Sequence, residues 1–579
     1  MSLDDFHWFM AAALLLPALL SYASLAVLFA WPESLPANRS LGLAGVFVAA
    51  VLLVGSVWLV IGVEFDWFGD LGRALRSTNG WQHQFWFFLP RDLFTLDVHI
   101  DSLSLYFILL SNVVAFAAAW IAARLTEPGA FKSWQAGLKK GTTRLTYPAF
   151  FYFCFSGFYF SMLLVPILDN LIGLWIGVEL TTLFSALVVG FRNTPAAWEA
   201  AWKYLVITSA GIVLALLGTM FLAHAIPEGA NAPGAPDSLM NWTALMTAAH
   251  GGTLTTDFVE LAFLFILIGY GTKAGLAPMH TWLPDGHGEA PPSISALLSG
   301  VLLKLALYAI LRFYAITNVA LGSTFLTSNL LLVMGLISLV VATPFILKRN
   351  RFKRVLAYHS VEHMGIICFG LGIGTPLALL GALLHSFNHA VTKALMFLAY
   401  GSVLKEYRKA LGWKVAERDK DWQVTGVLRV MPRTAALLAL GGFALVGTPP
   451  FGIFVSELMI LWGAIQRLIP VGAATAPPVW PPGPPGWAVA IAVGLFILTT
   501  TLIFYGLVRH LLDEHLFGKV PERTDRKAWR GRERLGADLA PLLFLALLVS
   551  FGVFLLAGSD LLETSLAILN GKSTGPGVR

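Results

Sequence analysis

The chain has 579 residues, of which 57% are hydrophobic and only 12% are charged, and its mean hydropathy is +0.73. Soluble domains typically carry about 25% charged residues, so this composition excludes an ordinary water-soluble protein and indicates a polytopic membrane protein. A net charge of +6 would suggest nucleic-acid binding in a soluble chain, but in a membrane protein it is typical of basic cytoplasmic loops. We therefore expect contact with membrane lipid and no nucleic-acid partner.

The cysteines and the N-terminus narrow the class of membrane protein further. Cys154 and Cys368 both lie in apolar runs. Two cysteines exclude cysteine-ligated iron–sulfur clusters and provide no disulfide framework, although a single pair stays open. The N-terminus is acidic and a long apolar run follows it, which favours a first spanning helix over a cleaved signal peptide.

Apolar runs of about 18–25 residues predict the membrane-spanning helices. In chain order they lie near residues 8–31, 41–64, 100–123, 149–168, 170–190, 201–224, 258–279, 291–313, 328–347, 355–375, 377–401, 435–465, 487–508 and 538–557. The sequence thus predicts an all-α polytopic membrane protein with about fourteen transmembrane helices.

The loops between these spans differ in charge. When they are assigned to alternate sides, most lysines and arginines fall on one side, in segments near residues 124–144, 348–354, 405–433 and 509–534. Because cytoplasmic loops are enriched in basic residues, that side is predicted to be the cytoplasm. Both termini are then expected on the non-cytoplasmic side, which requires an even number of spans.

Two predicted spans are interrupted by glycine and proline. One carries Lys273 and meets Pro278, which removes a backbone donor and breaks or kinks the helix. The other contains the glycine- and proline-rich run 447–452. Each occupies the same position in a five-helix unit, and because five is odd the second unit is inverted, as in transporters with matching broken helices.

These units divide the chain into four predicted regions. They are an N-terminal three-helix region (1–125), a first inverted repeat or half-channel (149–313), a second (328–508), and a basic cytoplasmic loop with the final transmembrane helix (509–579).

Ionisable side chains occur inside the predicted spans of both repeats. They are Glu179, Lys203, Lys273, Lys304, His385, His389, Lys393 and Glu457. A charge at mid-membrane costs roughly 3 kcal/mol on insertion scales, and chains of acidic, basic and histidine groups in membranes mark ion pathways. A buried lysine loses its proton on desolvation and regains it beside a carboxylate, so a movable pair switches proton affinity. Any one pair could instead fix helix packing, and Lys203 could snorkel, but the whole set predicts a proton relay.

A short motif suggests a different chemistry. His359, Glu362 and His363 fit the pattern H-x-x-E-H of one class of zinc proteases. No carboxylate elsewhere is an obvious third ligand, and the glycine-rich stretch that follows resembles a membrane span. A role in proton access from the basic loop is therefore favoured over zinc binding. The loop 280–289 is interpreted as a tight connection or the lining of an entrance, and no glycine loop has the spacing of a nucleotide site.

The same segments carry a family resemblance. Residues 271–285 read GTKAGLAPMHTWLPD, and residues 290–298 read APPSISALL. They resemble the hallmark segment of the antiporter-like subunits of respiratory complex I, membrane-bound hydrogenases and Mrp-type sodium/proton antiporters. Within that family, residues 358–365 (YHSVEHMG) and 449–457 (PPFGIFVSE) are most similar to the component F proteins of hydrogenase-4 and formate hydrogenlyase complexes.

The resemblance implies a fourteen-helix core of two inverted repeats in a bacterial or archaeal cell (inner) membrane. It implies proton translocation through Glu179 and Lys273, with Lys304 as central connector and Glu457 as terminal group of the second half. Histidines 385 and 389 with Lys393 match the family pattern more loosely. The redox centres of such complexes lie in other subunits, so no cofactor or metal is expected here. The expected partners are other membrane subunits, with a peripheral redox arm or a soluble coupled protein.

Three functions are consistent with the sequence. The first is a non-catalytic, proton-pumping subunit of a redox-driven respiratory or hydrogenase complex. The second keeps the fold but couples ion flow to inorganic-carbon uptake or to Mrp-type Na⁺/H⁺ antiport. The third is an intramembrane zinc protease that would use the H-x-x-E-H motif.

Overall fold

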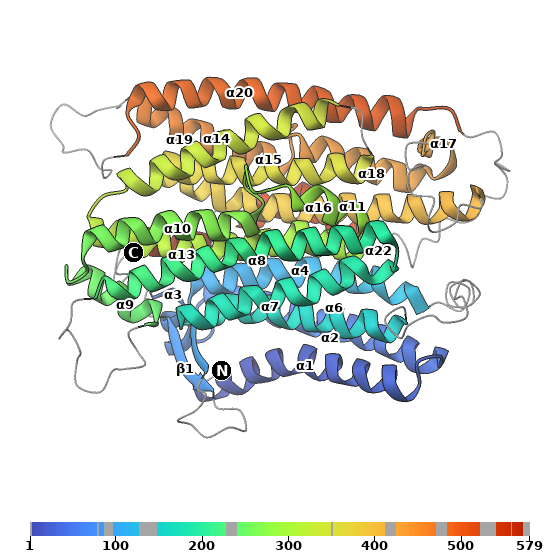
Figure 1. The fold of residues 1–579 in the computed structure, drawn as a ribbon, viewed down its shortest axis with the longest axis horizontal. Coiled ribbons are helices and arrows are strands. Elements are labelled where there is room, and N and C mark those ends of the chain that lie inside the picture. Colours follow the sequence, from blue (N-terminus) through green and yellow to red (C-terminus); the bar gives the residue numbers. More distant parts are fainter. Residues whose placement is uncertain are drawn as a thin grey trace.

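The computed structural model describes ten stretches of the chain. They are residues 3–77, 80–85, 96–126, 147–226, 240–348, 351–411, 424–469, 483–520, 540–556 and 559–570. Within them the chain is almost entirely helical, and the long helices run side by side from α1 (Leu3–Ala30) at one edge to α20 (Gly486–Arg509) at the other (Figure 1).

The N-terminal region holds the three predicted long helices, α1, α2 (Leu35–Glu64) and α4 (Ser102–Ala122). Between α2 and α4 lie elements that hydropathy did not predict. They are the short helix α3 (Asp70–Arg76) and the antiparallel strands β1 (Trp81–Phe85) and β2 (Leu96–Ile100), in which Trp81 pairs with Ile100. All are too short to span a membrane. The turn η1 (Ala123–Thr126) follows α4.

The first predicted repeat contains helices and short helical turns. In order they are α6 (Pro148–Leu164), η3 (Val165–Ile167), α7 (Leu171–Val189), η4 (Gly190–Arg192), α8 (Pro195–His224), α9 (Trp242–His250), α10 (Thr256–Ala274), α11 (Trp282–Glu289), α12 (Pro292–Leu297), the π-turn η6 (Leu298–Leu302) and α13 (Leu303–Leu321). Local chemistry sets the helix starts, since the side chains of Asn170 and Thr194 accept hydrogen bonds from the first turns of α7 and α8.

The second predicted repeat and the C-terminal region follow. Their elements are α14 (Phe325–Leu347), α15 (Phe352–Ile373), α16 (Pro376–Leu411), α17 (Val427–Val430), α18 (Pro432–Leu445), α19 (Gly452–Leu468), α20, the π-turn η8 (His510–Leu516), α22 (Ala540–Leu556) and α23 (Asp560–Leu569). The last helix, α23, was not predicted.

Both predicted interruptions are present as breaks between two helices. Gly275 ends α10 with a φ of +77°, and the chain turns through a cis Ala277–Pro278 bond before α11 begins. Gly447 follows α18 with a φ of +66°, and a cis Pro449–Pro450 bond precedes α19. A positive φ is easily adopted only by glycine, so these two glycines define where the helices end.

Helices occupy all fourteen ranges predicted from hydropathy. By length and composition, nine helical stretches in the described part of the chain are long and apolar enough to cross a membrane. Among them, the most apolar window of 292–321 is entirely buried, whereas those of α1 and α20 are only 28% buried. The stretch that carries Lys304 is therefore central, and the count of fourteen spans and the inverted repeats stay predictions.

The two terminal helices start at one end of the bundle. The ring of Phe6 in α1 lies edge-on to Trp81 of β1, with centroids 4.8 Å apart. At the start of α23, the Asp560 N–H donates to Glu64 Oε1 (3.2 Å), at the end of α2 beside α3. Both helices therefore begin beside the elements that join α2 to α4.

Candidate proton-translocation site

Glu179 and Lys273 face each other across a threonine. Thr182 lies one turn after Glu179 in α7 and donates to Glu179 Oε2 (3.1 Å), while its hydroxyl oxygen accepts from Lys273 Nζ. Ser209 of α8 donates to the other carboxylate oxygen at 2.5 Å. Among the described residues no direct ion pair joins Glu179 to Lys273, so the hydroxyl of Thr182 is the link between them.

Lys273 is fully buried in the last turn of α10, directly before the break. Its Nζ also donates to the hydroxyl of Tyr204 (3.2 Å), which shares a hydrogen bond with Ser185 Oγ (2.7 Å). Across the break, the indole of Trp282 donates to the Thr272 carbonyl (2.9 Å), which fixes α11 against the end of α10. The break therefore holds the lysine against hydroxyl groups from α7 and α8.

Lys203 lies elsewhere. Its side chain is 47% exposed and pairs with Glu199 (2.6 Å) and Asp285 (3.4 Å), and Asp285 also pairs with Arg354 (2.6 Å). The structure thus does not bring Lys203 into contact with Lys273. It belongs to a charged cluster that joins α8, α11 and α15.

Lys304 occupies the first turn of α13, immediately after the π-turn η6. It is fully buried, and its Nζ donates to the Ser299 carbonyl (2.7 Å) and contacts His389 Nδ1 (2.5 Å). A π-turn frees a backbone carbonyl from the regular helical ladder and is frequent at functional sites. Here the carbonyl within the turn serves as the acceptor for the buried ammonium group.

From Lys304 a line of three histidines follows, one on α15 and two on α16. The ring of His389 stacks on His363 with centroids 4.5 Å apart, and His363 Nδ1 lies 2.9 Å from His385 Nε2. The second nitrogen of His385 is bonded to Ser456 Oγ (3.0 Å), next to Glu457 in α19. His385 and His389 lie four residues apart on α16, and both contact His363.

The remaining predicted residues lie beside this line. His359 Nδ1 is 2.6 Å from Glu362 Oε2, and both side chains are buried within α15. Lys393 is fully buried, donates to the Leu356 carbonyl and lies 5.2 Å from the ring centroid of Phe397. No hydrogen bond among the described residues joins Lys273 to Lys304, so the two halves are not continuously connected in this conformation.

His287 lies between the halves, in the loop segment interpreted from sequence as structural. It is fully buried, it stacks on Phe397 at 5.1 Å, and in the described part of the chain neither ring nitrogen has a hydrogen-bond partner. The ring of Phe397 thus contacts both His287 of α11 and Lys393 of α16.

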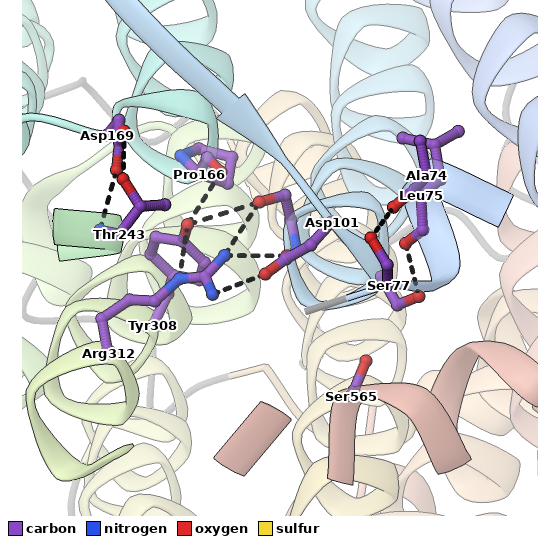
Figure 2. A network of polar contacts seen from close by, with 12 residues as sticks. Ala74, Leu75, Ser77, Asp101, Pro166, Asp169, Thr243, Tyr308, Arg312 and Ser565 are labelled. Carbon is purple, nitrogen blue, oxygen red and sulfur yellow. Dashed lines mark hydrogen bonds and ion pairs between the residues drawn. The ribbon is translucent and has the colours of Figure 1, made fainter. Parts of the chain in front are cut away.

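A second charged network fixes the end of the bundle near the hairpin (Figure 2). Arg312 donates to both oxygens of Asp101 (2.7 and 2.8 Å) and to Tyr308 OH (2.9 Å), and the guanidinium lies over Trp242 at 4.1 Å. Burial alone would raise the pKa of Asp101, but Arg312 holds it at about 2.

The carboxyl of Asp169, also in Figure 2, belongs to the same end of the bundle. Burial raises its pKa to about 6, against the hydrogen bonds from the hydroxyl and N–H of Thr243. These bonds fix the short helix α9 to the segment between α6 and α7.

The sequence did not single out the hydroxyl groups that connect the charges. Thr182, Ser185, Tyr204 and Ser209 are common residue types in membrane helices, and only the spacing of Thr182 from Glu179 was a usable signal. Ser299 and Ser456 likewise could not be singled out from sequence, because only the packed structure brings them against Lys304 and His385.

Similarity to known proteins covers the part of the chain that contains these residues. A family model described as NADH:quinone oxidoreductase/Mrp antiporter, TM, matches residues 169–476. A hydrogenase-4 component F homolog of Methylacidiphilum infernorum (isolate V4) is 38% identical over 369 residues, which cover 64% of this chain and 72% of that protein.

Two solved structures share the fold. A chain of the membrane-bound sulfane sulfur reductase, an archaeal respiratory membrane complex, superposes with a TM-score of 0.68 at 20% identity and covers 97% of each chain. A chain of the Mrp complex from Dietzia sp. DQ12-45-1b gives a TM-score of 0.69 at 18% identity and covers 96% of this chain and 97% of that one. At these identities the superpositions establish the fold alone.

The family match spans every side chain predicted for the relay, from Glu179 to Glu457. The resemblance found in the hallmark segment is confirmed, since more than half of the chain fits the family model. This multi-pass membrane protein belongs to the NADH:quinone oxidoreductase/Mrp antiporter transmembrane family.

Proposed function

We propose that this chain translocates protons as a membrane subunit of a redox-driven respiratory or hydrogenase complex. One observation carries the proposal. Lys273 lies fully buried at a helix break and is linked through the hydroxyl of Thr182 to the carboxylate of Glu179.

The chemistry of this arrangement supports transport of protons. Desolvation favours the neutral form of a lysine, and a nearby carboxylate favours its charged form. Movement of Glu179 toward or away from Lys273 would therefore load and unload a proton, and Thr182 can pass it between them. Because α10 ends one residue after Lys273, a rearrangement of the break would change the distance of this lysine from α7.

The second half would continue the path. Lys304 contacts His389, and the histidines lead through His385 to the segment of α19 that carries Glu457. Lys393, His359 and Glu362 lie beside this line and would supply it with protons through His363, which is part of the line. Lys203 would act on the relay through its pairs with Glu199 and Asp285, because it has no contact with Lys273.

The proposal also includes the arrangement of the helices and their orientation in the membrane. The broken pairs α10–α11 and α18–α19 would occupy matching positions in two inverted repeats, within a fourteen-span chain. The elements that begin and end the described chain lie at one end of the bundle, which supports both termini on the non-cytoplasmic side. The membrane would be the cell (inner) membrane of a bacterium or archaeon.

The proposed partners come from the relatives. One is named a hydrogenase-4 component F homolog, and the structural neighbours belong to a respiratory and an Mrp complex. We infer that other membrane subunits flank this chain, with a peripheral redox arm that supplies the energy. Subunits of quinone-reductase or hydrogenase type fit this role.

A second candidate is ion transport coupled to antiport or to inorganic-carbon uptake. The likeness to an Mrp chain supports the same fold for that work. A protease is not proposed, because His359 and His363 are fully buried within α15 and Glu362 is only 3% exposed, which leaves a peptide no access.

Two measurements test the proposal. Purification of the tagged chain from its native membrane should recover hydrogenase or quinone-reductase subunits; a single soluble zinc protein would support carbon uptake instead. In vesicles that contain the assembled complex, Glu179→Gln should abolish redox-driven proton uptake. Uptake equal to the wild type would show that the carboxylate only packs α7.

A further inference from the structure

Three side chains of the second half that belong to the proposed relay also converge on one point. His363 of α15, His385 of α16 and Glu457 of α19 each place one nitrogen or oxygen atom within 4.8 Å of the other two. Two imidazoles and a carboxylate are the ligand set of many zinc sites. The geometry points to a binding site for one divalent transition-metal ion of the zinc type at this position.

The distances suit a metal in place of a proton. His363 Nδ1 and His385 Nε2 are 2.9 Å apart, so they share a single hydrogen. Zinc–nitrogen bonds of about 2.0–2.1 Å at a tetrahedral angle place two ligand nitrogens roughly 3.3 Å apart. The rings need to separate by only a few tenths of an ångström to hold the ion.

Neighbouring residues hold two of the three ligands, His385 and Glu457, in position. Ser456 Oγ is bonded to His385 Nδ1 (3.0 Å), and such a partner on the second ring nitrogen fixes the orientation of a metal-binding histidine. Gly447 leaves the space that Glu457 needs, because a Cβ there would lie 2.5 Å from Glu457 Oε2. Ser456 and Gly447 both belong to the broken helix pair α18–α19.

Two more imidazole nitrogens adjoin this site without belonging to its ligand set, because the ion would take His363 Nδ1 and His385 Nε2. His363 Nε2 and His359 Nε2 are buried and have no hydrogen-bond partner among the described residues. Buried polar atoms are nearly always bonded. His359, Glu362 and His363 also form a second convergent group within 4.8 Å, so His363 is shared and Glu362 can add a second negative charge near the ion.

The ligand atoms select the class of metal. Imidazole nitrogens suit zinc, copper, nickel and iron, whereas calcium and magnesium take oxygen ligands. Two nearby carboxylates would balance a divalent charge, which lowers the cost of burying it.

The consequence for transport rests on the proposed function. A metal between His363 and His385 replaces the proton that they share and interrupts the line from Lys304 to Glu457. Bound zinc would therefore inhibit proton translocation from within the membrane.

Metal binding can be measured without any transport assay. The full-length chain, purified in detergent and treated with a chelator, should bind one Zn²⁺, and Co²⁺ in its place should give the intense visible absorption of a tetrahedral site. X-ray absorption of the zinc form should show two imidazoles and at least one oxygen. His385→Ala and Glu457→Gln should each weaken binding at least tenfold, while His287→Ala, at a buried histidine of α11 outside both convergent groups, should not.

Several results would overturn the site. They are the absence of stoichiometric binding in the wild type, equal affinity in His385→Ala, Glu457→Gln and the wild type, or loss of binding in His359→Ala with full affinity in Glu457→Gln. The last would place the ion on α15 alone. If a variant fails to fold, the X-ray absorption of the wild type still decides, because a shell without two imidazoles contradicts the assignment. Zinc binding without inhibition of transport would instead contradict the proposed function.

Discussion

At the scale of single residues, Thr182 is the side chain that connects Glu179 to Lys273 in the first half. Its hydroxyl donates to Glu179 and accepts from Lys273. A hydroxyl can pass a proton in this way because it has a donor and two acceptor positions. Among the described residues, no other side chain is hydrogen-bonded to both Glu179 and Lys273.

Removal of this hydroxyl should slow proton transfer. Thr182→Val keeps the shape of the side chain, so we expect redox-driven proton uptake to fall about tenfold, equivalent to about 1.4 kcal/mol on the barrier. Thr181→Val is the matched control, because Thr181 is equally buried and its hydroxyl bonds only to the Val178 carbonyl. Equal rates in the two variants would rule out Thr182 as the link.

The ion pair between Asp101 and Arg312 makes a prediction about stability. Arg312 is 1% exposed and Asp101 is fully buried. Asp101→Asn leaves a buried guanidinium without its anion, which should cost about 3–5 kcal/mol and lower the thermal unfolding midpoint of the purified chain.

The control for this variant is an exposed ion pair. Asp70 pairs with Arg73 and its side chain is 80% exposed, so Asp70→Asn should leave the midpoint unchanged. A midpoint of Asp101→Asn within error of the wild type would mean that the pair contributes nothing to the fold.

The charged residues could be predicted from sequence, but their partners could not. An ionisable group in an apolar run is costly and therefore conspicuous, which is why Lys273, Lys304 and Glu179 stood out. Lys203 stood out for the same reason, yet it is half-exposed and lies in a different cluster. The bridging threonine became visible only in the packed structure, because hydroxyl residues are unremarkable in membrane helices.

At the scale of elements, glycine lets α8 and α10 pack in close contact. A Cβ on Gly269 of α10 would lie 2.4 Å from the backbone nitrogen of Ala215, and one on Gly211 of α8 would lie 2.6 Å from Thr272. Small residues allow membrane helices to approach this closely. The contact sets the position of Lys273, one turn from Gly269.

Gly269→Ala should therefore separate the two helices. The added methyl group meets backbone that cannot rotate away, and such overpacking typically costs about 1–3 kcal/mol. We expect a lower unfolding midpoint and slower proton uptake. Gly494→Ala is the control, because no atom lies within 4 Å of a Cβ at that helical position; a loss of similar size there would contradict the packing argument.

Hydropathy predicted the long helices because each is an apolar run of sufficient length. It missed α3, the β1–β2 hairpin and α23, which are short and outside those runs. It also missed the π-turn η6, since a local change in hydrogen bonding leaves no mark on hydropathy. The break near Pro278 was predicted. In the structure α10 already ends at Ala274, because the next residue, Gly275, adopts a positive φ.

At the scale of the whole molecule, the fold buries Lys304 in its most enclosed span and places a broken helix pair on either side in sequence. The family match covers both pairs. On the proposed function, a change at one pair would have to reach the other through the central helix, because no hydrogen bond among the described residues joins Lys273 to Lys304.

Proton uptake by the assembled complex with Lys273→Ala tests the central claim most directly. The complex, reconstituted into liposomes and driven by its own redox reaction, should retain its subunits but lose redox-driven proton uptake, because no other group described in the first half can take the place of this buried amine. Uptake at the wild-type rate in a fully assembled Lys273→Ala complex would contradict the proposed role of the lysine.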